Sequence, residues 1–312
     1  MEIIKIVLLF AIITNALTGC IKENANIKRE DVAIQLDINL PGSLQNPAFS
    51  PDGSRIVFTH FRKGYNRPPA DLYLFNLETK ILSPLMVDGF NNVNLPGTSW
   101  NNELDAIAFS SERELDDEIY YINENGVNGD ERRITGRPDS VAFEPTFSPD
   151  GQWIVFETHK LDDEKYGVIT KYKLDGSSGY VNLTPVEEDN KQPNWSPSGD
   201  KILYQKKENN QWDIWMMNID GSDKIRVTNF EGNKTDAVFS KDGQFIIFSS
   251  DFGVELANIY KIPISGGQPT RLTYYKGYDG APAISPNASH LIFESSAGDP
   301  DRGKTSLWLL EL

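Results

Sequence analysis

The feature that most constrains this chain is a short turn, Phe/Trp-Ser-Pro-Asp-Gly, that recurs between two apolar runs. The clearest copy spans Phe147–Gly151 and is followed by the apolar run Ile154–Phe156. Pro at the second turn position holds φ at about −65°, Asp accepts a hydrogen bond from the backbone ahead of it, and Gly takes the left-handed conformation that ends the turn. Each copy therefore predicts a β-hairpin.

The spacing of these turns predicts the architecture. Counted from the turn Ser, the copies begin at 50, 148, 196, 240 and 285, and a degraded copy begins at Asn101. The steps between neighbouring copies are 51, 47, 48, 44 and 45 residues. Steps of this size are typical of one blade per repeat in a propeller. We therefore expect an all-β fold, a six-bladed β-propeller.

Each repeat is interpreted as four strands. An inner run such as Pro47–Phe49 precedes the turn, and a second run such as Ile56–Phe58 follows it. A third run with an Asp-x-Tyr/Trp pattern begins at residues such as Asp71 and Asp213, and the copy at Val168–Leu174 is looser. A Gly-centred hairpin turn then leads to an outer strand that ends in an apolar residue and Thr.

The two ends of this array predict how the ring closes. The sequence stops at Leu312, just after the third strand of the sixth repeat, whereas Val32–Ile38 alternates as a strand but has no blade of its own. Folded proteins avoid unpaired edge strands. We therefore expect the N-terminal strand to complete the last blade.

The N-terminus predicts export and lipid anchoring. Lys5 precedes the apolar run Ile6–Ile13, which is shorter than the roughly 20 residues of a membrane-spanning helix and is typical of a signal peptide. Leu17–Cys20 resembles the bacterial lipobox, so Cys20 is the expected lipidation site; the alternative is a chance cysteine in a discarded leader. We predict a signal peptide over 1–20, a flexible tether over 21–31 and the propeller over 32–312.

Charge and cysteine content narrow the partners. Cys20 is the only cysteine, so the mature domain cannot rely on disulfides. The net charge of −15 disfavours nucleic acid and anionic lipid surfaces as partners, because both require a basic surface. We expect a monomer that meets the membrane only through its lipid anchor. Ile21 is not the Asp that would suggest retention at the inner membrane, so the outer membrane is preferred.

Taken together, the Ser-Pro-Asp-Gly turns, the Asp-x-Tyr/Trp third strands and the Leu/Val-Thr outer strands resemble the TolB-type propeller repeats. The resemblance covers roughly residues 45–312. TolB itself carries an additional α/β domain before its propeller, for which this sequence has no room, so a propeller-only lipoprotein is expected. The resemblance implies a location in the bacterial cell envelope, periplasmic or at the outer membrane, and a protein or peptide partner at the channel mouth.

Propeller geometry supplies a candidate binding site, because the first residues of the inner strands lie at one mouth of the central channel. The position three residues before the Phe or Trp of each turn is occupied, in chain order, by Asn46, Gly97, Glu144, Gln192, Asp236 and Ala281. The four polar residues of this set, Asn46, Glu144, Gln192 and Asp236, are the predicted binding residues. The loops 62–67, 161–166 and 299–302 are expected on the same face, where binding loops of repeat proteins usually lie. The alternative is that these residues only hydrate a wide ring.

The sequence offers little catalytic chemistry. It contains no Gly-x-Ser-x-Gly nucleophile motif, and no two of His60, His159 and His290 have the spacing of metal ligands. We therefore predict a binding or scaffold propeller with no catalytic residue, metal or cofactor. The alternatives are a carbohydrate-active enzyme, a glycan lyase or hydrolase with its site in the channel, and a purely structural envelope protein.

Overall fold

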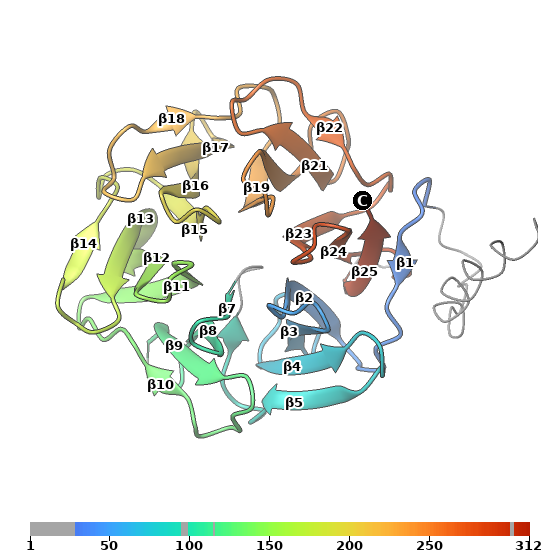
Figure 1. Cartoon of the computed structure of the whole chain (residues 1–312), viewed down its shortest axis with the longest axis horizontal. Coiled ribbons are helices and arrows are strands. Elements are labelled where there is room, and N and C mark those ends of the chain that lie inside the picture. Colours follow the sequence, from blue (N-terminus) through green and yellow to red (C-terminus); the bar gives the residue numbers. More distant parts are fainter. Residues whose placement is uncertain (1–28, 95–98, 115, 300–302) are drawn as a thin grey trace, which may run out of the picture.

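The structure is a computed structural model that describes residues 29–94, 99–114, 116–299 and 303–312. Across these ranges the regular elements are all strands, and none of the described segments is a helix long and apolar enough to cross a membrane. The strands form six antiparallel sheets arranged around a common axis (Figure 1). The six-bladed all-β propeller predicted from the turn spacing is therefore confirmed.

The first three blades each begin with their inner strand and end at the rim. Blade 1 contains β2 (Ser43–Phe49), β3 (Arg55–Phe61), β4 (Ala70–Asn76) and β5 (Leu82–Met86). Blade 2 contains β6 (Val93–Asn94), β7 (Trp100–Asn101), β8 (Ala106–Ser111), β9 (Glu118–Asn123) and β10 (Arg132–Arg133), with β6 and β7 both paired to β8. Blade 3 contains β11 (Ser140–Phe147), β12 (Trp153–Lys160), β13 (Asp163–Lys173) and β14 (Tyr180–Asn182).

The last three blades repeat this order, except that the sixth takes its outer strand from the N-terminal segment. Blade 4 contains β15 (Asn190–Trp195), β16 (Lys201–Glu208), β17 (Gln211–Asn218) and β18 (Ile225–Arg226). Blade 5 contains β19 (Lys234–Phe239), β20 (Phe245–Ser250), β21 (Asn258–Pro263) and β22 (Thr270–Arg271). Blade 6 contains β23 (Asp279–Ile284), β24 (His290–Ser295), β25 (Ser306–Glu311) and β1 (Ile34–Gln35).

Strand β1 closes the ring as predicted. It pairs antiparallel with β25, with Ile34 opposite Leu309, and the Leu36 amide extends the pairing to the Leu307 carbonyl at 2.9 Å. The strand is shorter than the predicted Val32–Ile38 because the Ile38 amide turns back to the Leu36 carbonyl, 3.0 Å away, and leaves the sheet. Figure 1 shows β1 at the rim of the last blade, beside β25.

The boundary between tether and propeller differs from the prediction. The tether was expected to run to residue 31, but Arg29 forms salt bridges of 2.8 Å with both Asp31 and Asp279. Buried charges need such partners, so these residues belong to the last blade. Cys20 and residues 21–28 lie outside the described residues.

The turn residues contribute as expected, and the turn Ser adds a contact that the sequence analysis did not include. In blade 1 the Ser50 hydroxyl donates to Asp52 at 2.6 Å and accepts from the Arg55 amide at 2.9 Å. Asp52 also accepts from the Ser54 amide at 3.0 Å, and Gly53 has a φ of 75°. The Ser side chain therefore pairs the first amide of the second strand and makes the turn rigid.

The apolar core lies between blades. One cluster joins Ile119 of blade 2 to Phe156 of blade 3, and another joins Phe58 of blade 1 to Ile292 of blade 6. All four side chains are fully buried. Burial of each such side chain contributes about 1.5–3 kcal/mol, so the interfaces between blades hold the ring together.

A repeated polar network explains the third- and outer-strand patterns. In blade 4 the Thr228 hydroxyl donates to Asp213 at 2.9 Å and accepts from the Ile214 amide at 2.9 Å, while Arg226 donates to Asp213 at 2.5 Å. The same positions form hydrogen bonds in two other blades. In blade 2 they are Arg133, Glu118 and Thr135. In blade 5 they are Arg271, Asn258 and Thr273. The acidic or amide residue that begins the third strand is therefore structural.

Candidate functional site

The candidate site is built on a bulge that interrupts the inner strands. The pairing between inner and second strands shifts register immediately around the aligned position in blades 1, 3, 4, 5 and 6. All five described residues at this position adopt left-handed backbone conformations, with φ of 49° at Asn46, 53° at Glu144, 48° at Gln192, 55° at Asp236 and 47° at Ala281. Positive φ is uncommon in residues other than Gly. Bulges change the direction of side chains, and these five blades share the same bulge. Gly97 lies outside the described residues.

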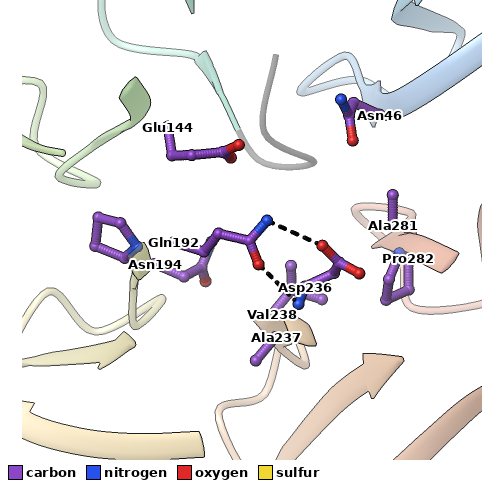
Figure 2. A pocket seen from close by; sticks show the side chains of 10 residues that line it. Asn46, Glu144, Gln192, Asn194, Asp236, Ala237, Val238, Ala281 and Pro282 are labelled. Atoms are coloured by element: carbon purple, nitrogen blue, oxygen red, sulfur yellow. Dashed lines mark hydrogen bonds between the residues drawn. The ribbon is translucent and has the colours of Figure 1, made fainter. Parts of the chain in front are cut away.

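The bulges bring the four predicted binding residues together. Asn46, Glu144, Gln192 and Asp236, which we call the channel mouth, line one cavity together with Ala281. The cavity has a volume of about 30 Å³, which is room for one or two water molecules. Each of the four side chains is partly exposed. Figure 2 shows them converging on the cavity from different blades.

Hydrogen bonds fix the channel mouth. The Gln192 Nε2 donates to Asp236 Oδ1 at 3.0 Å, and the Asp236 amide donates back to Gln192 Oε1 at 3.0 Å (Figure 2). The Asn46 Nδ2 donates to Asn94 Oδ1 at 2.9 Å. Because the bulge sets the backbone and neighbouring blades hold the side chains, these polar groups are pre-positioned.

A second polar ring lies beneath the channel mouth and was missed by the sequence analysis. It consists of the residue that follows the aromatic of each second strand: Thr59, Ser110, Glu157, Gln205, Ser249 and Glu294, all buried. Glu157 accepts from the Gln192 amide at 2.9 Å, and Glu294 accepts from the Asn46 amide at 3.0 Å. A long side chain in one blade thus supports the bulge of the next. The available signal was a polar residue directly after each Ile-Val-Phe-type run.

The carboxylates of the two rings carry an electrostatic cost. The pKa of Glu144 is raised to about 8, chiefly by burial and also by the charges of Glu157 and Asp236, while a hydrogen bond from Gln192 and the charge of Lys191 oppose the shift. Burial also raises the pKa of Glu294 to about 7, with a further contribution from Asp236 and an opposing hydrogen bond from the Asn46 amide. Desolvation and like charges both disfavour the ionised form of a carboxyl group. The raised pKa values therefore reflect the burial and the close spacing of the acidic groups at this site.

Two tyrosines join this site from opposite ends of the chain. Tyr65, in the predicted loop 62–67, donates to the Tyr278 hydroxyl at 3.3 Å, and Tyr278 donates to Glu294 at 3.0 Å. The two rings are perpendicular, with centroids 5.9 Å apart. Of the other expected loops, 161–166 is largely the start of β13, because Lys160 pairs with Asp163 across a tight turn. Residues 300–302 of the loop 299–302 lie outside the described residues.

The sequence matches a known family of propeller domains. Two overlapping matches to the family described as the TolB beta propeller domain (PD40) cover residues 22–210 and 177–303. The chain belongs to the TolB β-propeller domain family. It is 29% identical over 166 residues to the Tol-Pal system protein TolB of Francisella tularensis, which covers 53% of this chain and 36% of that protein. The aligned part is therefore just over a third of the length of that relative.

Solved structures show the same fold at low identity. TolB from Acinetobacter baumannii superposes on this TolB-type propeller with a TM-score of 0.64 at 16% identity, covering 83% of this chain and 64% of that one. An oligogalacturonate lyase from Vibrio parahaemolyticus superposes with a TM-score of 0.56 at 12% identity, covering 92% and 96%. These likenesses concern the propeller architecture.

The three histidines of this TolB-type propeller are separate from one another, on β3, β12 and β24. His60 Nε2 contacts the Pro41 carbonyl, His159 Nε2 lies 3.1 Å from Glu157 Oε1, and His290 Nδ1 lies 2.7 Å from the Ser289 hydroxyl. Within the ranges that the structure describes, no three His, Cys, Asp or Glu side chains are grouped as a metal site. Of the three, His159 alone contacts the polar rings.

Proposed function

We propose that this TolB-type propeller is a cell-envelope module that binds a protein or peptide partner at the channel mouth. The observation that carries the proposal is the convergence of Asn46, Glu144, Gln192 and Asp236 on one cavity, each from the bulge of a different blade. A few convergent polar groups on a rigid frame are what an orienting binding site requires. The partly exposed side chains leave polar atoms accessible to a partner.

The cell-envelope location is part of the same proposal. The Francisella tularensis relative is named a Tol-Pal system protein, and the lipobox-like segment Leu17–Cys20 supports export and lipidation at Cys20. A lipid on Cys20 would tether the propeller near a membrane surface, and the preference is for the outer membrane. A tethered propeller meets envelope partners at raised local concentration.

The competing function is a carbohydrate-active enzyme. The fold is shared with an oligogalacturonate lyase, and Glu144, with a pKa raised to about 8, is a carboxylic acid able to donate a proton at neutral pH. Against this, a mouth with several carboxyl groups repels a polyanionic sugar chain. We therefore prefer a binding module.

The test is cross-linking and affinity capture from bacterial envelope membranes with full-length protein. The site variant Glu144→Gln/Asp236→Asn removes two carboxyl groups from the channel mouth while preserving side-chain shape. Its matched control is Glu78→Gln/Glu187→Gln, which removes two charges from exposed positions. We expect a discrete protein that is captured by wild type and the control and reduced at least about tenfold with the site variant, as for hot-spot residues.

A Cys20→Ser variant tests the anchor separately. It is expected to remain in the soluble fraction and to bind the same partner when the partner is supplied in detergent extract. Equal capture by the site variant and wild type would place the binding surface elsewhere. Capture of no protein, together with cleavage of a neutral glycan by wild type and not by Glu144→Gln, would favour the enzyme.

A further inference from the structure

The channel mouth and the ring beneath it gather four carboxyl groups, of which Glu157 lies 3.1 Å from His159 Nε2 and Glu144 experiences the charge of Lys191. Glu144 and Asp236 come from inner strands, and Glu157 and Glu294 from second strands. Among the described residues that line the cavity, none is Lys or Arg. The raised pKa of Glu294, about 7, reflects burial and the nearby charge of Asp236. A cation placed here would remove this repulsion.

Aromatic rings stand beside these carboxylates. Tyr278 donates to Glu294 at 3.0 Å, and Tyr65, with 37% of its surface exposed, meets Tyr278 edge to face. Burial raises the pKa of both Tyr65 and Tyr278, and the charges of Glu294 and Asp236 raise it further. The same two carboxylates therefore act on both rings. Ring faces attract cations through their quadrupole, so rings and carboxylates favour the same kind of ligand.

The second polar ring contains an unsatisfied polar group. The Ser249 hydroxyl is fully buried and has no hydrogen-bond partner among the described residues. Ser249 occupies the ring position of Glu157 and Glu294, and its register partner Thr235 donates to Asp236 at 2.9 Å. A buried hydroxyl without a partner costs free energy, so this part of blade 5 is not fully satisfied.

We propose that the channel mouth binds the side chain of a Lys or Arg residue in an extended segment of the partner, held between Tyr65 and Tyr278 and the carboxylates of Asp236 and Glu294. This inference rests on the proposed function and specifies the chemistry of the partner. The cavity of about 30 Å³ admits the tip of a side chain and not a folded domain. The ammonium or guanidinium group supplies only donors, which matches a site rich in acceptors.

A basic side chain fits the observations better than an inorganic cation. Among the described residues, no three His, Cys, Asp or Glu side chains are close enough together to form a coordination shell for a metal ion. Tyrosine rings contribute to cation–π contacts with organic cations. The alkyl stem of Lys or Arg also covers apolar surface such as Ala281.

The test uses a displayed library of random unstructured peptides selected against wild-type full-length protein. Selected peptides are resynthesised with each Lys replaced by norleucine and each Arg by citrulline. We expect one basic position whose replacement weakens binding at least about tenfold, and the same loss with Asp236→Asn or Glu294→Gln. Tyr65→Leu is expected to weaken binding by about three- to tenfold, whereas Tyr65→Phe keeps it. The control Glu78→Gln/Glu187→Gln keeps wild-type affinity.

The outcomes separate this inference from the function on which it rests. Peptides that lose affinity with Asp236→Asn but tolerate replacement of every basic residue would overturn the inference and leave channel-mouth binding intact. Peptides that bind all site variants equally would overturn both. Equal weakening by the control pair would show attraction to the overall acidic surface, and would also overturn the inference. Melting temperatures of Asp236→Asn and Tyr65→Phe establish that these variants are folded.

Discussion

Arg29 and Asp279 form a buried salt bridge of 2.8 Å although 250 residues separate them in the sequence. The guanidinium also donates to the Ser295 hydroxyl at 3.1 Å and lies about 5 Å from the centre of the Trp308 ring. The paired strand β1 has only two residues. The N-terminal segment is therefore held to blade 6 by the side-chain contacts of Arg29 as well as by backbone pairing.

The first prediction concerns the salt bridges of Arg29. Arg29→Ala leaves Asp31 and Asp279 as buried carboxylates without their partner, and breaking one side of a buried ion pair typically costs about 3–5 kcal/mol. The matched control is Lys173→Ala, which breaks an exposed pair with Asp175 and should cost at most about 1 kcal/mol. Urea unfolding measures both. A loss of unfolding free energy below 1 kcal/mol in Arg29→Ala would mean that these salt bridges contribute little to holding the N-terminal segment in place.

The second prediction concerns the polar network of blade 4. Thr228→Val removes a hydroxyl that accepts from the Ile214 amide and donates to Asp213. The shape is preserved, but a buried amide and a buried carboxylate lose a partner, at a cost of about 1–3 kcal/mol. Thr270→Val, at an exposed outer-strand position, should change unfolding free energy by less than about 0.5 kcal/mol. Equal effects in the two variants would show that the network adds no stability.

The third prediction concerns the bulge of blade 6. Ala281 has a φ of 47° and lines the cavity. Ala281→Val places a β-branched residue in the left-handed region and should destabilise by more than about 1–2 kcal/mol. The control is Ala281→Asn, which also introduces a larger side chain than Ala. Asn tolerates this backbone conformation, as Asn46 does in blade 1. Thermal unfolding should therefore separate the two variants. Similar melting temperatures would refute backbone strain as the constraint.

Much of this architecture could be predicted from the sequence because one hairpin turn sets the phase of every blade. Once Ser50 and its equivalents mark the start of each second strand, counting backward places Asn46 and Asp236 at equivalent positions. The ring symmetry then gathers them at one cavity. The predicted closure is confirmed by the antiparallel pairing of β1 with β25.

The rest depends on contacts that no local pattern shows. Tyr65 and Tyr278 are 213 residues apart and meet only because the closed ring places blade 1 beside blade 6. The left-handed bulge was not predicted, since Glu144 and Gln192 carry no preference for positive φ. The support of the Gln192 bulge by Glu157 and of the Asn46 bulge by Glu294, each from the preceding blade, likewise requires the blade-to-blade geometry.

The last prediction concerns pH. The pKa of Glu144 is raised to about 8 and that of Glu294 to about 7, chiefly by burial, whereas the unfolded values lie at about 4.3. The folded state therefore binds more protons than the unfolded state between these limits. Stability is fully present below the unfolded pKa and is lost as pH rises through 7 and 8, by at most about 1.4 kcal/mol per pH unit for each group. Unfolding free energy measured in urea should fall between pH 5 and pH 8, and Glu144→Gln/Glu294→Gln should flatten this dependence while Glu78→Gln retains it. A wild-type protein equally stable at both pH values would show that these carboxyl groups ionise normally in the folded ring.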